Sequence, residues 1–595
     1  MEKEVRGVCP YCGCGCTFYF KVNNNKIIGI RGDVWDDVSG GVPCVKGFTC
    51  YDSVYAKDRI KKPMIRIKGK LKEVTWERAY DFIYKNLKNL NGDEISFYIS
   101  SPASNEDGYV FQKFAKEIFH SGNIDSCARL CHASTVYAMN KIFCISGMNA
   151  RIDDLKKADC ILMFGTNPKF SYPNMYKKMD RSKIIYAGPV ENESAEDGIF
   201  IKINDGSDVA FLNCILNLLN VNLPKDVEKN IKLYDIKRAK EICNFDEEKL
   251  KYIVEFIKKS KKFVLCFGMG LTQHVYGVNN VLAAINLVLA KKGKLIPMRG
   301  KVNIQGVGDM GCTPKTDTFI NSVFFDAVKA FYIVESNPAM SLPDLNKVHK
   351  ILKKRFLILQ TSFPNETMKF ANVVLPSCLW CEREGTFTTS ESRVRYFEKA
   401  VDPLFGKENW RIIQELGNRF NKRFKDYYNT KEILKDIKEN IKGYNFNIKK
   451  LIEGKDQFVK RKIKRGEYSK VEYFDVEGVT NKEYPLLLTT IRSEYAFCTG
   501  DMSKRTRLNK LDNPYCYINK RDADKFKIKD NNLIKIISRV GSIKIKAKIS
   551  NKASTGLVSV PFNFDSVLVN KIIPLQFSPI VEEPNFKKVA VRIEK

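Results

Sequence analysis

The sequence predicts a multidomain α/β protein with a small cysteine-rich module at the N-terminus, two doubly wound α/β domains and a C-terminal β-barrel. Three observations predict this class. Cysteines gather within the first 50 residues, unbroken apolar strands alternate with helices over residues 61–400, and strands with period-two alternation appear after residue 480. With 595 residues, of which 44% are hydrophobic, the chain is long enough for several packed cores.

Residues 1–60 form the predicted cysteine-rich module. Its strands Phe18–Val22 and Lys26–Arg31 alternate around an asparagine turn, so this hairpin would return the chain toward the first cysteines. Four thiols on such a loop suit either a zinc ion or a 4Fe–4S cluster. A structural zinc site usually has two separated CxxC pairs, whereas this module has three cysteines close together and a distant fourth. The spacing therefore favours a 4Fe–4S cluster on Cys9, Cys12, Cys16 and Cys44.

Three other residues of the module bear on this cluster. Cys14 is surplus to the four thiols, and Cys50 falls outside the spacing and is expected to pack in the core. Lys46 follows Cys44 by two positions. It is either a solvated lysine or a positive charge between the cluster and a second cofactor.

Residues 61–400 alternate helices with short apolar strands. Thr75 is predicted to cap a helix whose apolar face includes Ala79, Ile83 and Leu87. The strands are rich in Ile, Val, Leu and Phe without alternation, which is typical of strands buried on both faces of a parallel sheet. With helices between them, they predict two interleaved, doubly wound α/β domains. The predicted strands are Ile95–Ser100, Cys160–Phe164, Lys183–Tyr186, Lys262–Phe267, Ala330–Val334, Phe356–Gln360 and Ala371–Leu375.

Several of these strands run directly into turn residues. The three loops are Gly165-Thr-Asn167-Pro168, Gly268-Met-Gly270 and Glu335-Ser336-Asn337-Pro338. Ligands of doubly wound sheets bind beyond the carboxyl ends of the strands. Glycine, serine and asparagine there let the backbone approach a phosphate or a base. An Asn-Pro turn alone is most often only a turn, but one in each half indicates two related nucleotide-binding halves.

The rest of the chain changes character twice. Residues 401–480 are rich in Lys and Asn and have a helical pattern near Trp410–Phe420, which predicts a helical connection with an exposed linker around residues 455–473. Residues 481–595 are predicted to form a small β-barrel domain. Its strands are Tyr484–Thr490, Leu533–Arg539, Ser542–Ile549 and Gly556–Pro561.

A second cysteine stretch, Cys127-Ala-Arg129-Leu-Cys131-His132, holds the strongest catalytic candidates. A Cys-His pair at the start of a helix is usually part of a core. Here it lies between a cluster motif and nucleotide-site loops, in a chain with only four histidines. A thiolate can bind a soft, redox-active metal, and a histidine beside it can move a proton.

Charge and hydropathy limit the partners. The formal charge of +32 comes from dispersed lysines rather than long basic blocks, so the interpretation is a solvated surface and no nucleic-acid binding. The functional alternative is attraction of anionic substrates, phosphate-rich cofactors or an acidic partner. The charged N-terminus is unlike an export signal, and the most apolar helix, at Val278–Ala290, is too short to span a bilayer. We therefore expect a cytoplasmic chain without membrane insertion.

The order of the motifs along the chain resembles that of the molybdenum- and tungsten-dependent formate dehydrogenases, which belong to the larger family of bis-pterin oxidoreductases. The similarity covers nearly the whole chain. Beyond the two cysteine stretches it is carried by Gly268-Met-Gly-Leu-Thr-Gln-His274, Met298-Arg299-Gly300-Lys-Val-Asn303-Ile-Gln305-Gly306, Phe363-Pro-Asn-Glu366-Thr367, Val373-Val-Leu-Pro376, Glu382-Arg-Glu-Gly385-Thr386-Phe387, Tyr484-Pro-Leu-Leu-Leu-Thr-Thr490, Thr499-Gly500 and Pro584-Asn-Phe-Lys-Lys.

The resemblance implies an enzyme, the catalytic subunit of a formate dehydrogenase that oxidises formate to CO2. Cys131 would bind the metal, where some relatives carry selenocysteine. His132 would lie beside the reacting C–H bond, Arg299 would hold the formate carboxylate and Lys46 would relay electrons. The implied cofactors are one 4Fe–4S cluster and a bis-molybdopterin guanine dinucleotide with molybdenum or tungsten. The implied pterin-binding residues are Gly165, Asn167, Gly268, Gly270, Gln273, His274, Gly300, Asn303, Gln305, Ser336, Asn337, Glu366, Thr367, Thr499 and Gly500.

The resemblance also implies a partner. One cluster and no visible nicotinamide or flavin domain call for a separate electron-accepting iron–sulfur or flavin subunit. Short single-cluster chains of this kind are similar to the archaeal type, whose beta subunit reduces coenzyme F420. The sequence departs from its relatives at Ala187-Gly-Pro-Val190, where Asp-Pro-Arg is usual, at Lys301, where Gln is usual, and at Ser134, where Pro is common.

Two alternatives stay open at this stage. A formylmethanofuran dehydrogenase-like subunit shares the Cys-His pair, but such subunits usually lack the C-terminal barrel. A non-catalytic electron-transfer subunit would keep the fold and the cluster without the pterin site. The sequence does not distinguish molybdenum from tungsten.

Overall fold

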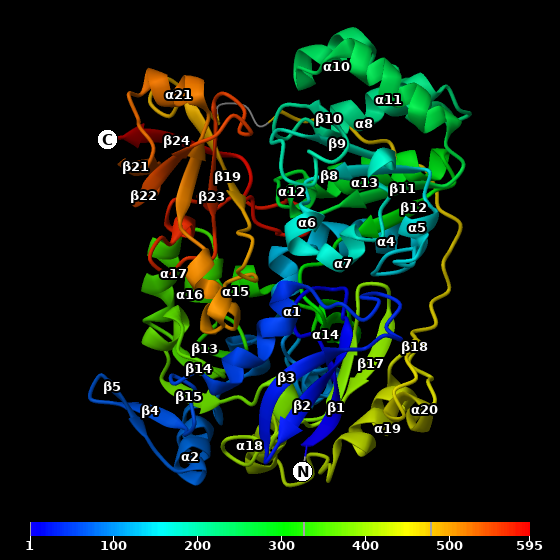
Figure 1. Ribbon diagram of the computed structural model, residues 1–595. Helices are drawn as coiled ribbons and strands as arrows, with labels where there is room; N and C mark the ends of the chain where they lie inside the picture. The colour runs from blue at the N-terminus through cyan, green and yellow to red at the C-terminus, as the bar shows by residue number, and fades with distance from the viewer. Residues whose placement is uncertain (1, 325–327, 476–478) are drawn as a thin grey trace. The chain divides into compact units, whose positions relative to one another are not determined.

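The computed structural model describes residues 2–324, 328–475 and 479–595 (Figure 1). The chain forms two compact units, each built from separate segments. Unit 1 comprises Met1–Arg129, Gly300–Arg461 and Tyr495–Leu511. Unit 2 comprises Leu130–Arg299, Lys462–Glu494 and Asp512–Lys595. The two α/β domains are thus interleaved along the sequence.

The N-terminal part of unit 1 is a three-stranded antiparallel sheet. Strands β2 (Thr17–Asn23) and β3 (Lys26–Gly32) form the predicted hairpin, which is confirmed, and Asn24 and Asn25 at its turn have positive φ angles. Strand β1 (Glu2–Val8) was not predicted from the sequence, and it pairs with β2 along its whole length. The short helix α1 (Val45–Thr49) follows this sheet and begins directly after Cys44.

The main sheet of unit 1 has seven strands in the order β5-β4-β15-β14-β13-β6-β7. All neighbours are parallel except the pairs that include β4. The chain order reverses between β6 and β13, which marks a doubly wound sheet with a topological switch point. The strands are β4 (Met64–Ile67), β5 (Lys70–Glu73), β6 (Ile95–Ile99), β7 (Ile124–Ser126), β13 (Ala330–Val334), β14 (Phe356–Thr361) and β15 (Val373–Pro376).

Helices cover this sheet and bury the apolar faces that the sequence predicted. Helix α2 (Trp76–Leu87) begins at Thr75, whose side chain accepts a hydrogen bond from the Arg78 N–H, so the predicted cap is confirmed. The other helices here are α3 (Asn105–Lys113), α14 (Ile304–Asp309), α15 (Phe319–Phe324), α16 (Pro338–Ser341) and α17 (Leu345–Leu352).

Residues 385–461 complete unit 1 rather than linking domains. Strands β16 (Gly385–Thr388), β17 (Arg393–Phe397) and β18 (Gln457–Phe458) form a small antiparallel sheet. Helices α18 (Asn409–Phe420) and α19 (Thr430–Asn440) bury Trp410, Leu416 and Ile433 in the unit's core. Helix α20 (Ile448–Ile452) follows.

Unit 2 contains an all-parallel sheet in the order β10-β9-β8-β11-β12. The order reverses between β8 and β11, so this sheet is also doubly wound. Every residue of β8 and β11 is buried, as the unbroken apolar runs predicted. The strands are β8 (Cys160–Phe164), β9 (Ile184–Gly188), β10 (Ile199–Lys202), β11 (Phe263–Phe267) and β12 (Lys294–Pro297).

Ten helices of unit 2 accompany this sheet in the described residues, and the apolar α8 and α13 pack against each other in its core. They are α4 (Ala133–Phe143), α5 (Asp154–Lys157), α6 (Pro168–Ser171), α7 (Pro173–Tyr176), α8 (Asp208–Leu219), α9 (Lys225–Ile231), α10 (Ile236–Cys243), α11 (Glu247–Lys259), α12 (Met269–Thr272) and α13 (Gly277–Ala290). In no described part of the chain is a helix long and apolar enough to cross a membrane.

The C-terminal part of unit 2 is a closed barrel in the order β19-β23-β20-β22-β21-β24. Alternate residues of β21 and β22 are buried, as the period-two pattern predicted. The strands are β19 (Leu486–Ile491), β20 (Tyr515–Ile518), β21 (Leu533–Ser538), β22 (Gly541–Ile549), β23 (Leu557–Pro561) and β24 (Val589–Glu594), and the helix is α21 (Lys520–Lys525).

The segment expected to be an exposed linker, around residues 455–473, exposes many of its side chains and packs on unit 2 near residues 469–471. Asn213 and Asn230 donate side-chain hydrogen bonds to the carbonyl of Val471, which is 2% exposed. Asn286 bonds both backbone groups of Ser469. These side-chain amides satisfy backbone hydrogen-bonding groups at residues 469–471, which lie in neither a helix nor a strand.

Candidate functional site

The predicted cluster ligands come from two places in unit 1. Cys9, Cys12 and Cys16 lie on the loop between β1 and β2, and Cys44 lies at the start of α1. The loop closes through hydrogen bonds from Cys9 N to Cys16 O (2.8 Å) and from Gly15 N to Cys12 O (3.1 Å). Gly15 has φ +60°, and a Cβ atom there would lie 2.4 Å from Thr389 Cγ2, so glycine is required. The fold thus brings both parts of the motif into one module.

The electrostatics show that these thiols are neighbours. Burial raises the pKa of Cys9, and the nearby Cys50, Cys44, Cys16 and Cys12 raise it further. Four crowded, buried thiols favour binding as metal thiolates, because a bound cluster compensates the repulsion between their charges. Within the described ranges no three or more His, Cys, Asp or Glu side chains are placed to hold a single metal ion.

Cys14 and Lys46 also lie against this site. Cys14 is buried and forms side-chain hydrogen bonds with Cys12 and Cys16, which raise its pKa. Burial raises the pKa of Cys44, and the positive charge of Lys46 opposes that rise. Lys46 is itself only 5% exposed, so it is not the solvated surface lysine of the alternative interpretation.

Cys131 is positioned by the loop that follows strand β11 in unit 2. Thr272 Oγ1 donates to the Cys131 carbonyl at 2.7 Å, and Gln273 Nε2 donates to the Leu130 carbonyl at 2.5 Å. Helix α4 begins immediately after His132, and the Ser134 N–H in its first turn donates to Glu583 Oε2 at 2.8 Å. The Cys131 side chain is only partly buried. The backbone of the Cys-His pair is therefore fixed from both sides.

His132 is fully buried beside two arginines of the same unit. Burial lowers the pKa of His132 well below its ordinary value, and the charges of Arg299 and Arg492 lower it further. Its Nδ1 lies 3.3 Å from Thr135 Oγ1, while Nε2 makes no well-formed hydrogen bond with any described residue. The ring is therefore neutral near pH 7 and can accept a proton.

Arg299 reaches this place from the end of the neighbouring strand. It follows β12, where Met298 N donates to the Phe267 carbonyl at 2.8 Å and Tyr172 Oη donates to the Met298 carbonyl at 2.5 Å. Arg299 is 2% exposed, and one of its nitrogens donates to the Ser146 carbonyl. Unit 2 thus brings together Cys131, His132 and Arg299.

The predicted pterin residues of unit 2 line its switch point. Gly165 ends β8 with φ +52°, and a Cβ there would lie 2.5 Å from backbone atoms of Gly270 and Leu271. The Asn167 side chain bonds Glu193 and Ser194. His274 Nε2 lies 2.8 Å from the Gly270 carbonyl, and burial lowers its pKa to about 4. Gln273 and Gly268 belong to the same loop.

The predicted pterin residues of unit 1 form three groups. Asn337 donates to Glu366 Oε2 (2.6 Å) and accepts from Thr367 Oγ1 (2.9 Å), so the loops after β13 and β14 are tied together. Asn303 donates to the Ala103 carbonyl at 2.9 Å. The remaining members are Ser336 beside Asn337, Gly300 and Gln305 near Asn303, and Thr499 with Gly500, whose φ is +84°.

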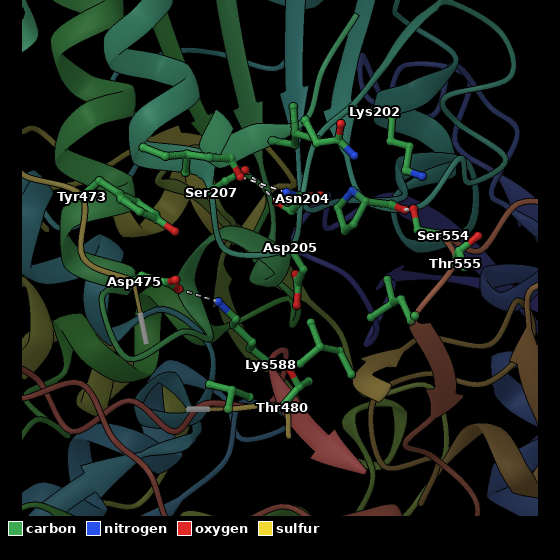
Figure 2. A pocket seen from close by; sticks show the side chains of 18 of the residues that line it. Lys202, Asn204, Asp205, Ser207, Tyr473, Asp475, Thr480, Ser554, Thr555 and Lys588 are labelled. Atoms are coloured by element: carbon green, nitrogen blue, oxygen red, sulfur yellow. Dashed lines mark hydrogen bonds and ion pairs between the residues drawn. The ribbon is translucent and has the colours of Figure 1, made fainter. Parts of the chain in front are cut away.

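A cavity of about 570 Å³ opens in unit 2 beyond β9 and β10, within the range of small-molecule sites (Figure 2). Lys588 extends into it between Asp475, at 3.2 Å, and Asp205. Lys202, Arg521 and the hydroxyl side chains of Ser554 and Thr555 also line it. Basic and hydroxyl groups of this kind suit a phosphate-bearing ligand.

The stretch at residues 187–190, where the resemblance led us to expect Asp-Pro-Arg, lies at this cavity. Ala187 and Gly188 are the last residues of β9, while the Pro189 carbonyl accepts a hydrogen bond from Ser554 and Val190 pairs with Ala553. The backbone therefore bonds barrel residues here.

Two carboxyls at the start of α8 make the stability of the folded protein depend on pH. Burial raises the pKa of Asp205 to about 6 and, with repulsion from Asp205, that of Asp208 to about 7. Folding raises the pKa of Asp208, so the protein must ionise this buried carboxyl at a cost as the pH rises from about 4 to 7. The free energy of unfolding falls over that range by an amount on the order of 3 kcal/mol.

Asp208→Asn is expected to raise Tm more at pH 8 than at pH 5. Differential scanning calorimetry checks this, and an equal change at both pH values would contradict a protonated buried carboxyl.

Three residues near Cys131 were not predicted from the sequence, namely Lys587, Arg492 and Glu583. Burial lowers the pKa of Lys587 to about 8. The negative charge of Asp205 opposes this change, and so does Cys131, while the charge of Arg492 adds to it. Lys587 Nζ donates a hydrogen bond to the Thr490 carbonyl at 2.5 Å. The charge of Arg492 lowers the pKa of His132, and Glu583 accepts a hydrogen bond from the Ser134 N–H. The Pro584-Asn-Phe-Lys-Lys motif could have pointed to Lys587, whereas Arg492 has no sequence signal.

Comparison with protein families identifies three matching regions. The model described as "Molybdopterin oxidoreductase" matches residues 59–419. "Molybdopterin oxidoreductase Fe4S4 domain" matches residues 2–56, and "Molydopterin dinucleotide binding domain" matches residues 486–590. The last two cover the cysteine module and the barrel.

Curated proteins are similar over the full length of the chain. The chain is 33% identical to "F420-dependent formate dehydrogenase subunit alpha" of Methanocaldococcus jannaschii, covering 100% of this chain and 99% of the relative. It is 29% identical to subunit alpha of F420-dependent formate dehydrogenase 2 of Methanococcus maripaludis, with 100% and 99% covered. It is 27% identical to formate dehydrogenase H of Escherichia coli, with 100% and 96% covered.

Among solved structures, acetylene hydratase from Pelobacter acetylenicus aligns with a TM-score of 0.81 at 15% identity, covering 100% of both chains. At this identity the likeness establishes the fold alone. Together with the family matches it confirms the predicted fold class. The iron–sulfur and pterin-dinucleotide domains confirm the predicted cofactors, a 4Fe–4S cluster and a bis-molybdopterin.

Proposed function

The chain belongs to the molybdopterin oxidoreductase family, and from this premise we propose that it is the catalytic subunit of a formate dehydrogenase. The observation that carries the proposal is the gathering of Cys131, His132 and Arg299 in unit 2, with the Cys-His backbone held by Thr272 and Gln273. The full-length similarity to formate dehydrogenase subunits supports it.

Each residue has a defined task in formate oxidation. Cys131 would supply the thiolate ligand of the metal. Arg299 would bind the formate carboxylate through its planar guanidinium, and its bond to the Ser146 carbonyl fixes the orientation of that group. The neutral His132 would accept the proton released as formate becomes CO2. When bound, the metal–pterin centre supplies the acceptor for the two electrons.

Electrons then leave through the iron–sulfur module. We propose Lys46, buried beside Cys44, as the charge that lies on the path between pterin and cluster. The acceptor would be a separate beta subunit that reduces coenzyme F420, as the names of the methanogen relatives suggest, and the complex would be cytoplasmic. The cavity of Figure 2 is proposed to receive the nucleotide end of one pterin.

The closed C-terminal barrel does not fit a formylmethanofuran dehydrogenase-like subunit, which usually lacks that domain. A non-catalytic subunit would have no reason to keep Cys131, His132 and Arg299 together.

The deciding experiment is formate-dependent reduction of a viologen dye by anaerobically purified chain without its partner. A viologen takes electrons directly from the cluster, so turnover is expected. Iron, metal and pterin contents are measured on the same sample. A sample that holds all three cofactors and does not oxidise formate would contradict the proposal and indicate another small oxidisable substrate.

Arg299→Lys is expected to raise the formate concentration for half-maximal viologen reduction by about 10–100-fold, with a smaller change in kcat. A point charge replaces a bidentate fork, which removes binding shared by ground state and transition state. The measurement is the formate dependence of the initial rate at constant metal content. If Arg299→Ala kept the wild-type dependence, Arg299 would not be the carboxylate anchor.

A further inference from the structure

An exposed apolar patch lies on the iron–sulfur module of unit 1, between the end of β3 and the end of α1. Trp35 is 90% exposed and Val34 is 67% exposed. Val42, Val45 and Phe48 complete what we call the module patch, with exposures of 52%, 47% and 36%. Single exposed apolar residues are ordinary, but a group of them that includes an almost fully exposed tryptophan marks an interaction site.

The turn that presents Trp35 is held in place from beneath. Asp33 and Asp36, on either side of Val34 and Trp35, are 6% and 3% exposed. Asp33 accepts hydrogen bonds from Thr17 Oγ1 (2.8 Å) and from Trp35 N (3.1 Å), and Asp36 forms a buried ion pair with Arg395 at 2.8 Å. Trp35 is therefore displayed on an ordered turn, and its exposure does not result from a loose loop.

The five residues form one surface. Gly41 packs directly on Val34, because a Cβ atom at Gly41 would lie 3.2 Å from Val34 Cα, and Val42 is the next residue. Val45 and Phe48 are three positions apart on α1, so their side chains lie on the same face of that helix. Leu511, which is 57% exposed, ends a short 3-10 helix (Arg507–Leu511) that packs against α1.

Two residues of the module patch flank Cys44, the most exposed of the four predicted cluster ligands. Cys44 lies between Val42 and Val45 and is partly exposed, whereas Cys9, Cys12 and Cys16 are buried. An electron that leaves the cluster toward solvent therefore has its shortest route through this face of unit 1. Any redox centre that takes electrons from the cluster has to lie against it, since transfer slows steeply with distance.

We propose that the module patch is the docking site of the electron-accepting subunit, a protein with its own iron–sulfur or flavin centre and an acidic surface around a complementary apolar face. The proposal rests on the proposed function. Formate oxidation to CO2 releases two electrons and one proton. When bound to Cys9, Cys12, Cys16 and Cys44, the cluster would supply the one-electron route by which the partner's centre is reduced, and the proton would leave to solvent.

Charge and chemistry favour this occupant over a second copy of the chain. The exposed Lys510 lies on the short 3-10 helix that packs against α1, where Arg507 is paired with Asp52 at 2.7 Å. The chain carries a formal charge of +32, so an acidic partner is attracted and a second copy is repelled. A second copy would also offer only an identical cluster and no net electron acceptor. Tryptophan at the centre of such a contact is the residue type that most often dominates binding energy.

The test uses the complex isolated anaerobically from producing cells through an affinity tag on this chain. The probe partner is the co-purifying subunit, identified by its flavin or iron–sulfur absorbance and by formate-dependent reduction of its own centre. Trp35→Glu is compared with wild type and with Tyr428→Glu, a matched control whose aromatic side chain is 75% exposed between α18 and α19, outside the patch. Trp35→Ala serves as a second variant.

Both Trp35 variants are expected to keep cluster absorbance and viologen turnover, since Trp35 contacts neither the cluster ligands nor the catalytic residues. Partner content and formate-dependent reduction of the partner should fall at least tenfold in Trp35→Glu and less in Trp35→Ala, and stay at the wild-type level in Tyr428→Glu. Hydroxyl-radical labelling of Trp35 should be suppressed in the complex and restored when salt removes the partner.

Three results would overturn the docking site. They are full partner content in Trp35→Glu, equal labelling of Trp35 with and without the partner, and a wild-type chain that purifies as a dimer broken by Trp35→Glu. Failure of the proposed function looks different, because wild-type protein with all its cofactors would then be silent toward viologen while the labelling still reports whether the patch is covered.

Discussion

Replacing Cys131 with alanine is expected to abolish formate oxidation while the iron–sulfur cluster stays in place. The methyl group cannot bind a metal, and the neighbouring His132 is buried, with the charges of Arg299 and Arg492 acting on it. The loss in viologen turnover should be on the order of a thousandfold or more. Cluster content is followed by iron analysis and visible absorbance, since all four cluster thiols belong to the other unit.

Cys144→Ala is the matched control for that variant. Cys144 is an exposed cysteine at the C-terminal end of α4, the helix that begins beside Cys131, and it should keep full activity. Substantial formate turnover by Cys131→Ala would remove Cys131 from the metal site. Loss of the cluster in the same variant would mean that the substitution disturbs folding.

Replacing Arg395 with alanine is expected to destabilise unit 1 by about 3–5 kcal/mol and to release the cluster, because it leaves the buried Asp36 carboxylate without its cation. Arg395, on β17, is 1% exposed. It pairs with Asp36 at 2.8 Å and Asp456 at 3.0 Å, and donates to the Gly15 carbonyl at 2.7 Å inside the cysteine loop. Although burial raises the pKa of Asp36, Arg395 keeps it below its ordinary value, so both groups are charged.

Urea unfolding and iron content measure this effect under anaerobic conditions. Arg31→Ala is the control, since Arg31 forms an ion pair with Glu4 in the same sheet with both side chains 41% exposed, and exposed pairs of this kind contribute little. Equal stability of the two variants would show that the Arg395 network does not hold the cysteine loop.

The sequence predicted those parts of the fold whose causes are local. Unbroken apolar runs identified β8 and β11 because both faces of these strands are buried, and Thr75 identified a helix start because its side chain bonds the first turn. Strand β1 was missed because its first three residues are exposed and charged, while its pairing with β2 depends on residues farther along the chain.

The candidate site was predictable where residues lie within one motif. Cys131 and His132 are adjacent, and the glycine loops follow directly from strand ends. Arg492 and Lys587 could not be found this way, since they approach the site from the barrel, more than 350 positions along the chain from Cys131, and neither has a characteristic spacing. The contacts of the linker near residues 469–471 could not be predicted for a related reason, because asparagines of distant helices bond its backbone.

The division of each unit into separate chain segments has a consequence during synthesis. Unit 1 receives its last segment, Tyr495–Leu511, only after most of unit 2 has been made, and the barrel closes only when β24 pairs with β19 and β21 at the end of the chain. Neither unit can finish folding while the ribosome is still translating earlier residues, and the long sequence separations slow the final assembly. The nascent protein therefore stays open until β24 has been made, which leaves a period in which bulky cofactors can enter.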